Sequence, residues 1–154
     1  MLDRSAFLRP IAHRGLHNAS RGRVENTSLA FEAALARGYG IECDVRPARD
    51  GTPMVFHDAS LDRLIEGSGP LAARGPAELK TLRYLGHDTR MLTFAELLEM
   101  VAGKVPLLVE MKSEWKAPDP EFLKPVAGLA AAYQGPLALM SFDPALISAA
   151  SWAW

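Results

Sequence analysis

The sequence contains little cysteine, no excess of charge of either sign and no long apolar run. Cys43 is the only cysteine among 154 residues, which excludes an internal disulfide framework. The 17 basic and 18 acidic residues give a formal net charge of −1, which argues against nucleic acid as a partner because surfaces that bind it normally carry a basic excess. No stretch approaches the roughly 20 apolar residues of a membrane span, and the N-terminus lacks the apolar core of a secretory signal. We therefore expect a cytoplasmic protein without a membrane span.

The length of the chain limits the number of domains. A chain of 154 residues, of which 49% are hydrophobic, can bury one core but is too short for two ordinary domains. We therefore expect residues 1–154 to form a single domain.

Short apolar runs alternate with helical patterns along most of the chain. Five runs predict strands, at residues 8–12, 39–45, 53–56, 105–111 and 137–140. Helices are predicted over residues 28–37, over residues 93–102, which open with a capping-box pattern, and after the Asp-Pro pairs at 119 and 143. This alternation predicts an α/β fold with a parallel sheet and helices outside it. Residues 58–92 are the least regular segment, and we expect a long loop there with one short helix at residues 77–82.

Polar clusters come at the ends of four predicted strands: His13-Arg14-Gly15, Glu42-Cys43-Asp44, His57-Asp58 and Glu110-Met111-Lys112. Side chains alternate between the two faces of a sheet, so Glu42 and Asp44 share one face while Cys43 points to the other. Glu110 and Lys112 share a face for the same reason. Because ligands bind beyond the carboxyl ends of parallel strands, we expect the four clusters to converge.

Three of the four carboxylates in these clusters lie on two of the predicted strands. Glu42, Asp44 and Glu110 would repel one another in isolation, and a hard divalent cation with oxygen ligands would remove that repulsion. The sequence therefore predicts a metal site for Mg²⁺ or Ca²⁺.

The basic residues of the same clusters suit a phosphate ester. Arg14 and Lys112 can neutralise phosphoryl oxygens beside the metal. His13 and His57 supply imidazole groups, which titrate near neutral pH and can act as general base and general acid. His87 has no obvious partner and receives no catalytic role. Metal-assisted cleavage of a phosphate ester is the predicted chemistry.

Taken in order, these motifs resemble those of the glycerophosphodiester phosphodiesterase family. The resemblance covers nearly the whole chain and rests on His13-Arg14-Gly15, Glu25-Asn26-Thr27, Glu42-Cys43-Asp44-Val45, Asp50-Gly51, His57-Asp58 with Leu61 and Arg63, Glu110-Met111-Lys112 and Ser141-Phe142-Asp143. It implies a TIM-type (β/α) barrel that hydrolyses a small-molecule glycerophosphodiester to glycerol 3-phosphate and an alcohol.

The resemblance also implies roles for particular residues. His13 and His57 correspond to the acid-base pair, Arg14 and Lys112 to phosphate contacts, and the metal ligands are Glu42, Asp44 and Glu110. The order in which the two histidines act is left open. So is the choice between attack by water and attack by the glycerol hydroxyl of the substrate.

The length of the chain departs from that family. An eight-stranded barrel takes about 250 residues, whereas this sequence ends after the fifth predicted strand and the start of its helix. We expect a barrel truncated after about the fifth strand, with three strands missing and with self-association through exposed sheet edges. Two alternatives stay open: an inactive fragment or noncatalytic binding protein, and a related phospholipase D-like phosphodiesterase or lyase.

Overall fold

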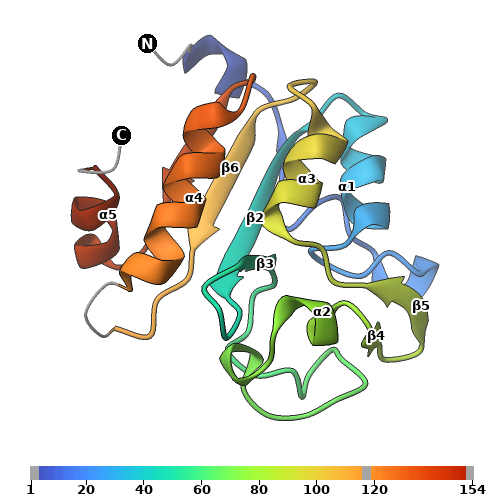
Figure 1. Cartoon of the computed structure of the whole chain (residues 1–154). Coiled ribbons are helices and arrows are strands. Elements are labelled where there is room, and N and C mark those ends of the chain that lie inside the picture. Colours follow the sequence, from blue (N-terminus) through green and yellow to red (C-terminus); the bar gives the residue numbers. More distant parts are fainter. Residues whose placement is uncertain (1–3, 116–118, 152–154) are drawn as a thin grey trace.

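The main sheet contains four parallel strands. The computed structural model describes residues 4–115 and 119–151 (Figure 1). In its sheet the parallel strands follow the order β1 (Ile11–Ala12), β2 (Gly40–Pro47), β6 (Leu107–Met111) and β7 (Leu137–Met140). The register sets Asp44 of β2 beside Glu110 of β6. The parallel α/β architecture predicted from the sequence is therefore confirmed.

The fifth strand of this sheet runs in the opposite direction. β3 (Pro53–Val55) pairs antiparallel with β2, with Val45 opposite Val55. The prediction of a further parallel strand at residues 53–56 was wrong, because only residues 48–52 separate the two strands and a parallel crossover needs a dozen or more. Gly51 closes the turn with φ +85°, and a Cβ there would lie 2.4 Å from the carbonyl oxygen of Glu121.

Helices cover one face of the sheet. Figure 1 shows α1 (Ser28–Leu35), α3 (Phe94–Val101) and α4 (Pro120–Ala132) along that face, with α5 (Pro144–Ser151) beside α4. The predicted capping box is present: the side chain of Thr93 accepts a hydrogen bond from the backbone N–H of Glu96, and the Glu96 carboxylate accepts one from the backbone of Thr93. Asp119 caps α4 in front of Pro120.

The principal core lies between the sheet and these helices. Its sheet side chains alternate as expected, so that Ile41, Cys43 and Val45 of β2 are all fully buried in it. Phe94 and Leu97 of α3 contribute from the helix layer and are also fully buried. The opposite face of β2 is thereby left to the carboxylates.

Residues 58–92 are folded rather than forming a loop. This segment contains η3 (Leu71–Ala73), α2 (Pro76–Leu79) and a hairpin of β4 (Arg83–Tyr84) with β5 (His87–Arg90). A second hydrophobic cluster lies under it, in which Leu61, Leu71, Leu79 and Tyr84 are fully buried. The predicted short helix is present but lies at 76–79 instead of 77–82, and the expectation of a long loop was wrong.

Two further short elements lie near the N-terminus, the 3₁₀ turns η1 (Arg4–Phe7) and η2 (Ala19–Arg21). Among the described helices, none combines the length and the apolarity that crossing a membrane would require.

Candidate active site

Three carboxylates converge at the carboxyl ends of β2 and β6. Glu42, Asp44 and Glu110 are 5%, 1% and 7% exposed, and each offers an oxygen within 4.8 Å of the oxygens of the other two. The alternation along β2 and the parallel register with β6 bring them together. The sequence therefore predicted their convergence correctly.

The charge balance of this cluster leaves room for a cation. Burial is the main cause that raises the pKa of Glu42 to about 7. The hydrogen bond from the backbone N–H of Arg14 opposes this rise, whereas repulsion from Asp44 and Glu110 adds to it. Among the described residues, neither Oε1 of Glu42 nor Oδ1 of Asp44 has a hydrogen-bond partner, although both atoms are buried. Buried carboxylate oxygens without donors are costly, and a divalent cation with oxygen ligands would satisfy them. The donor set therefore fits Mg²⁺ or Ca²⁺.

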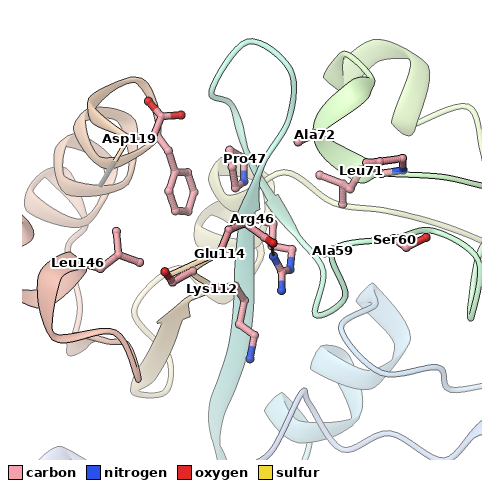
Figure 2. A pocket seen from close by; sticks show the side chains of 13 residues that line it. Arg46, Pro47, Ala59, Ser60, Leu71, Ala72, Lys112, Glu114, Asp119 and Leu146 are labelled. Atoms are coloured by element: carbon pink, nitrogen blue, oxygen red, sulfur yellow. Dashed lines mark hydrogen bonds and ion pairs between the residues drawn. The ribbon is translucent and has the colours of Figure 1, made fainter. Parts of the chain in front are cut away.

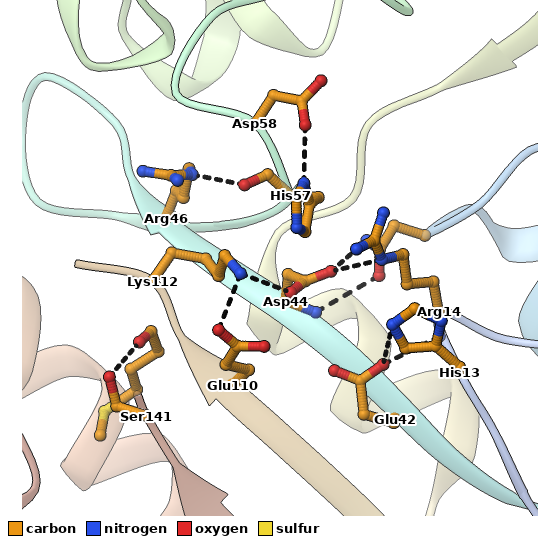
Figure 3. Close-up of polar contacts among 12 residues, drawn as sticks. His13, Arg14, Glu42, Asp44, Arg46, His57, Asp58, Glu110, Lys112 and Ser141 are labelled. Carbon is orange, nitrogen blue, oxygen red and sulfur yellow. Dashed lines mark hydrogen bonds and ion pairs between the residues drawn. The ribbon is translucent and has the colours of Figure 1, made fainter. Parts of the chain in front are cut away.

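Two cationic side chains border the carboxylates (Figure 3). The Lys112 ammonium lies 2.7 Å from Oε1 of Glu110 and 3.5 Å from Oδ1 of Asp44. Nε of Arg14 lies 3.4 Å from Oδ2 of Asp44, and its backbone N–H donates to Glu42 at 2.9 Å. Both predicted phosphate contacts are therefore adjacent to the predicted metal ligands.

Asn26 also belongs to this site, although the sequence alone indicated no role for it. Its side-chain amide donates to Oδ2 of Asp44 at 2.9 Å, and the residue is 1% exposed. Its φ of +57° lies in the left-handed region, which asparagine tolerates better than most residues. The signal was available in the motif Glu25-Asn26-Thr27, but the contact depends on a backbone turn that the sequence does not reveal.

His57 is held by its neighbour in the sequence. Nδ1 of His57 lies 2.6 Å from Oδ1 of Asp58, and Figure 3 shows the ring above the Asp44 carboxylate. Burial would raise the pKa of Asp58, but hydrogen bonds from Arg63 and His57 outweigh it and lower this pKa to about 2. An ionised Asp58 fixes the orientation of the imidazole and leaves its Nε2 for other contacts.

Arg63 connects this pair to the other side of the site. Its guanidinium donates to Asp58 and, at 2.7 Å, to Oε1 of Glu25, which also accepts from Arg14 at 2.9 Å. A continuous series of ionic contacts therefore runs from His57 to Asp44. Glu25, Asp58 and Arg63 belong to the motifs that carry the family resemblance, but the sequence did not predict that they are linked.

His13 lies at the edge of the cluster. Its Nε2 is 3.9 Å from Oε2 of Glu42, and its side chain is 68% exposed. Figure 3 shows the rings of His13 and His57 on different sides of the carboxylates. All seven predicted site residues thus lie around one centre, and contacts through Asp58, Arg63 and Glu25 link His57 to Arg14.

Fold and site together define a class: α/β barrel-type proteins with a polar centre of buried carboxylates at the carboxyl ends of parallel strands. The sequence matches the model of the glycerophosphoryl diester phosphodiesterase family over residues 13–153, and the chain belongs to that family.

Curated relatives and solved structures agree with this assignment. A probable glycerophosphodiester phosphodiesterase 1 of Mycobacterium tuberculosis is 38% identical over 117 residues, which cover 66% of this chain and 42% of the relative. Glycerophosphodiester phosphodiesterase 1 of Rattus norvegicus is 42% identical over 112 residues, covering 66% and 33%. The chain thus spans less than half the length of these relatives.

Among solved structures, an Oleispira antarctica phosphodiesterase in complex with the product sn-glycerol-3-phosphate has a TM-score of 0.82 at 27% identity, covering 97% of this chain and 64% of that one. The glycerophosphodiester phosphodiesterase of Thermotoga maritima has a TM-score of 0.73 at 30% identity, covering 92% and 57%. The chain therefore corresponds to part of such a barrel.

Proposed function

We propose that this protein hydrolyses glycerophosphodiesters to glycerol 3-phosphate and an alcohol, in a reaction that requires a divalent metal. The observation that carries the proposal is the convergence of Glu42, Asp44 and Glu110, buried and within 4.8 Å, in a chain of this family. The product found in the Oleispira antarctica relative supports the substrate class.

The three carboxylates would hold the metal ion. Their oxygen donors suit Mg²⁺ and Ca²⁺ alike. The bound ion would act as a Lewis acid that neutralises charge on a phosphoryl oxygen. Asn26 keeps Asp44 in place through its amide hydrogen bond.

The cationic side chains would bind the remaining phosphoryl oxygens. Arg14 and Lys112 each lie within 3.5 Å of an Asp44 oxygen, so both can contact a phosphate seated on the carboxylate cluster. Their positive charges compensate the negative charge that develops in the transition state.

The two histidines would transfer the protons. The nucleophile's oxygen bonds to phosphorus as the bond between phosphorus and the alcohol oxygen breaks. One histidine accepts the proton that the nucleophile loses, and the other donates a proton to the departing alcohol. His13 and His57, on different sides of the cluster, suit these two tasks, and Asp58 orients the ring of His57.

Turnover of glycerophosphocholine tests the proposal. We expect the protein to release glycerol 3-phosphate in the presence of Mg²⁺ or Ca²⁺, and to lose this activity in excess EDTA and recover it when metal is restored. Release of glycerol 3-phosphate that persists undiminished in EDTA would contradict the metal requirement. No release under any metal would contradict the hydrolase assignment and favour a noncatalytic role.

We further propose that copies of this chain associate through the edges of the sheet. Within the described residues, β1 pairs only with β2 and β7 only with β6, so both strands have an edge that can pair with another chain. Size-exclusion chromatography should show dimers or larger species, and a monomer at all concentrations would contradict this. The predicted cytoplasmic location and the predicted absence of a nucleic-acid partner remain expectations from composition.

A further inference from the structure

A cavity of about 460 Å³ opens beside the candidate active site (Figure 2). Its apolar wall comes from four separate elements: Pro47 from β2, Leu71 from η3, Phe122 from α4 and Leu146 from α5. Its volume falls within the roughly 300–1,000 Å³ that small-molecule sites occupy. The cavity is thus large enough to hold part of a substrate.

Lys112 joins this cavity to the carboxylate cluster. The side chain of Lys112 lines the cavity, and its ammonium also contacts Glu110 and Asp44. A phosphate held by Lys112 above the carboxylates would therefore have one of its ester substituents at the mouth of the cavity.

The charged side chains that line the cavity are engaged with other protein groups. Nε of Arg46 donates to the carbonyl oxygen of His57 at 2.6 Å, and its Nη1 donates to the Glu114 carboxylate. Asp119 accepts a hydrogen bond from the backbone N–H of Glu121 as the N-cap of α4. Arg46 and Asp119 thus stabilise the segments that line the cavity.

The two serines of the lining are engaged as well. The hydroxyl of Ser60 donates to the side chain of Asp62 and lies 3.3 Å from the carbonyl oxygen of Gly69. The hydroxyl of Ser113 donates to Asp143 and accepts from the backbone N–H of Trp115. The cavity is consequently lined mainly by apolar surface, and several of its polar side chains already hydrogen-bond to other protein groups.

We propose that this cavity receives the alcohol portion of the substrate and selects alcohols with an apolar alkyl or aryl part over polyols. This inference rests on the proposed function. A polyol placed against this mainly apolar lining would give up more hydrogen bonds to water than the lining can replace, which is unfavourable. An alkyl or aryl group would instead bury its surface against Pro47, Leu71, Phe122 and Leu146.

Ala72 and Ala73 provide a matched pair of variants. Both are exposed residues of η3, but only Ala72 lines the cavity. Ala72→Phe should place a ring in part of the cavity without disturbing a buried core, and Ala73→Phe adds the same ring next to it but outside the cavity.

The turnover experiment compares glycerophosphohexanol with glycerophosphoglycerol. For the unmodified protein we expect kcat/KM to be roughly tenfold or more higher for the hexanol ester, because one or a few methylenes in an apolar pocket contribute at least that much. Ala72→Phe should remove this preference and Ala73→Phe should keep it. Equal kcat/KM values, a preference for the polyol, or a preference that survives in Ala72→Phe would overturn the inference.

A binding experiment separates this inference from the proposed function. If glycerophosphocholine and both esters are left intact, the proposed function fails, and the cavity is tested by titration with hexyl phosphate and methyl phosphate. We expect hexyl phosphate to bind roughly tenfold more tightly, with the difference lost in Ala72→Phe and kept in Ala73→Phe. Equal affinities in the unmodified protein would overturn the cavity assignment.

Discussion

The sheet with its helices and the segment at residues 58–92 each pack around a hydrophobic cluster, but the two regions differ in the length of the elements that form the cluster. In the first region, strands β2 and β6 and helices of eight or more residues provide most of the core, and α1, α3 and α4 pack on the sheet. In the second, strands and helices of two to four residues surround a core that includes Leu79 and Tyr84. Short elements of this kind depend on tertiary contacts, because local preferences alone do not stabilise them.

The two regions also contribute differently to the site. The sheet provides Glu42, Asp44 and Glu110, whose positions follow from strand register, and Lys112 comes directly after β6. The segment at residues 58–92 provides Asp58 and Arg63, which hold His57 and Glu25 by hydrogen bonds. We infer that the first region supplies the metal and phosphate contacts, and the second orients one of the two histidines.

The largest expected effect is on kcat, and it should distinguish histidines that follow strands β1 and β3 from the histidine in the hairpin. His57→Ala and His13→Ala should each lower kcat by roughly 10²- to 10⁴-fold, because general acid-base catalysis contributes about that much. His87→Ala, in β5, should retain full activity. Steady-state kinetics on variants with unchanged melting curves checks this, and a loss of only a few-fold at His13 or His57 would remove that residue from the mechanism.

A stability comparison tests whether the second core is a true core. Leu79 and Leu97 are both fully buried, one in each hydrophobic cluster. Leu→Ala at either position should lower the free energy of unfolding by about 2–5 kcal/mol, the usual range for a buried leucine. Urea denaturation measures both, and a loss below about 1 kcal/mol for Leu79→Ala alone would show that residues 58–92 are loosely packed.

The sequence indicated the sheet and the carboxylates because both follow from local rules. Alternation along the predicted strand at residues 39–45 was enough to bring Glu42 and Asp44 to one face. The apolar character of β3 did not indicate whether this strand runs parallel or antiparallel to β2. The link between the two strands has only five residues, which is too short for a parallel crossover. The contact between Asn26 and Asp44, and the connection of Arg63 to Glu25, join residues 18 and 38 positions apart, so no local pattern predicts them.

A smaller effect on the free energy of unfolding should appear at acidic pH. The pKa of Asp58 is lowered from 3.8 to about 2 in the folded protein, so the stability contributed by this carboxylate is fully present above pH 4 and is lost as the pH falls toward 2. Arg63→Ala removes the guanidinium that lowers this pKa and that of Glu25, so the variant should lose less stability between pH 4 and pH 2 than the unmodified protein.

Urea midpoints at several pH values measure this difference. Arg83→Ala is the control, since Arg83 pairs with Glu66 in a similarly exposed position. An identical acid dependence of the Arg63→Ala variant and the unmodified protein would show that Arg63 does not control the ionisation of Asp58.

The smallest expected effect on the free energy of unfolding comes from a substitution at the junction of the two regions. Thr93 begins α3 directly after the segment at residues 58–92, and its hydroxyl accepts from the backbone N–H of Glu96. Thr93→Ala should lower the free energy of unfolding by about 1 kcal/mol, as loss of an N-cap typically does. Thr81→Ala, at an exposed hydroxyl that contacts only its own turn, should change it by less. Equal effects of the two substitutions would show that the capping box contributes little.

Direct metal binding tests the central claim, that Glu42, Asp44 and Glu110 form a divalent metal site. Isothermal titration of the unmodified protein with Mg²⁺ and with Ca²⁺ should show one site for at least one of the two ions. Asp44→Asn, which removes one ligand charge, should abolish it, while Asp50→Asn, in the exposed turn between β2 and β3, should leave it unchanged. Absence of binding in the unmodified protein, or unchanged binding in Asp44→Asn, would contradict the account.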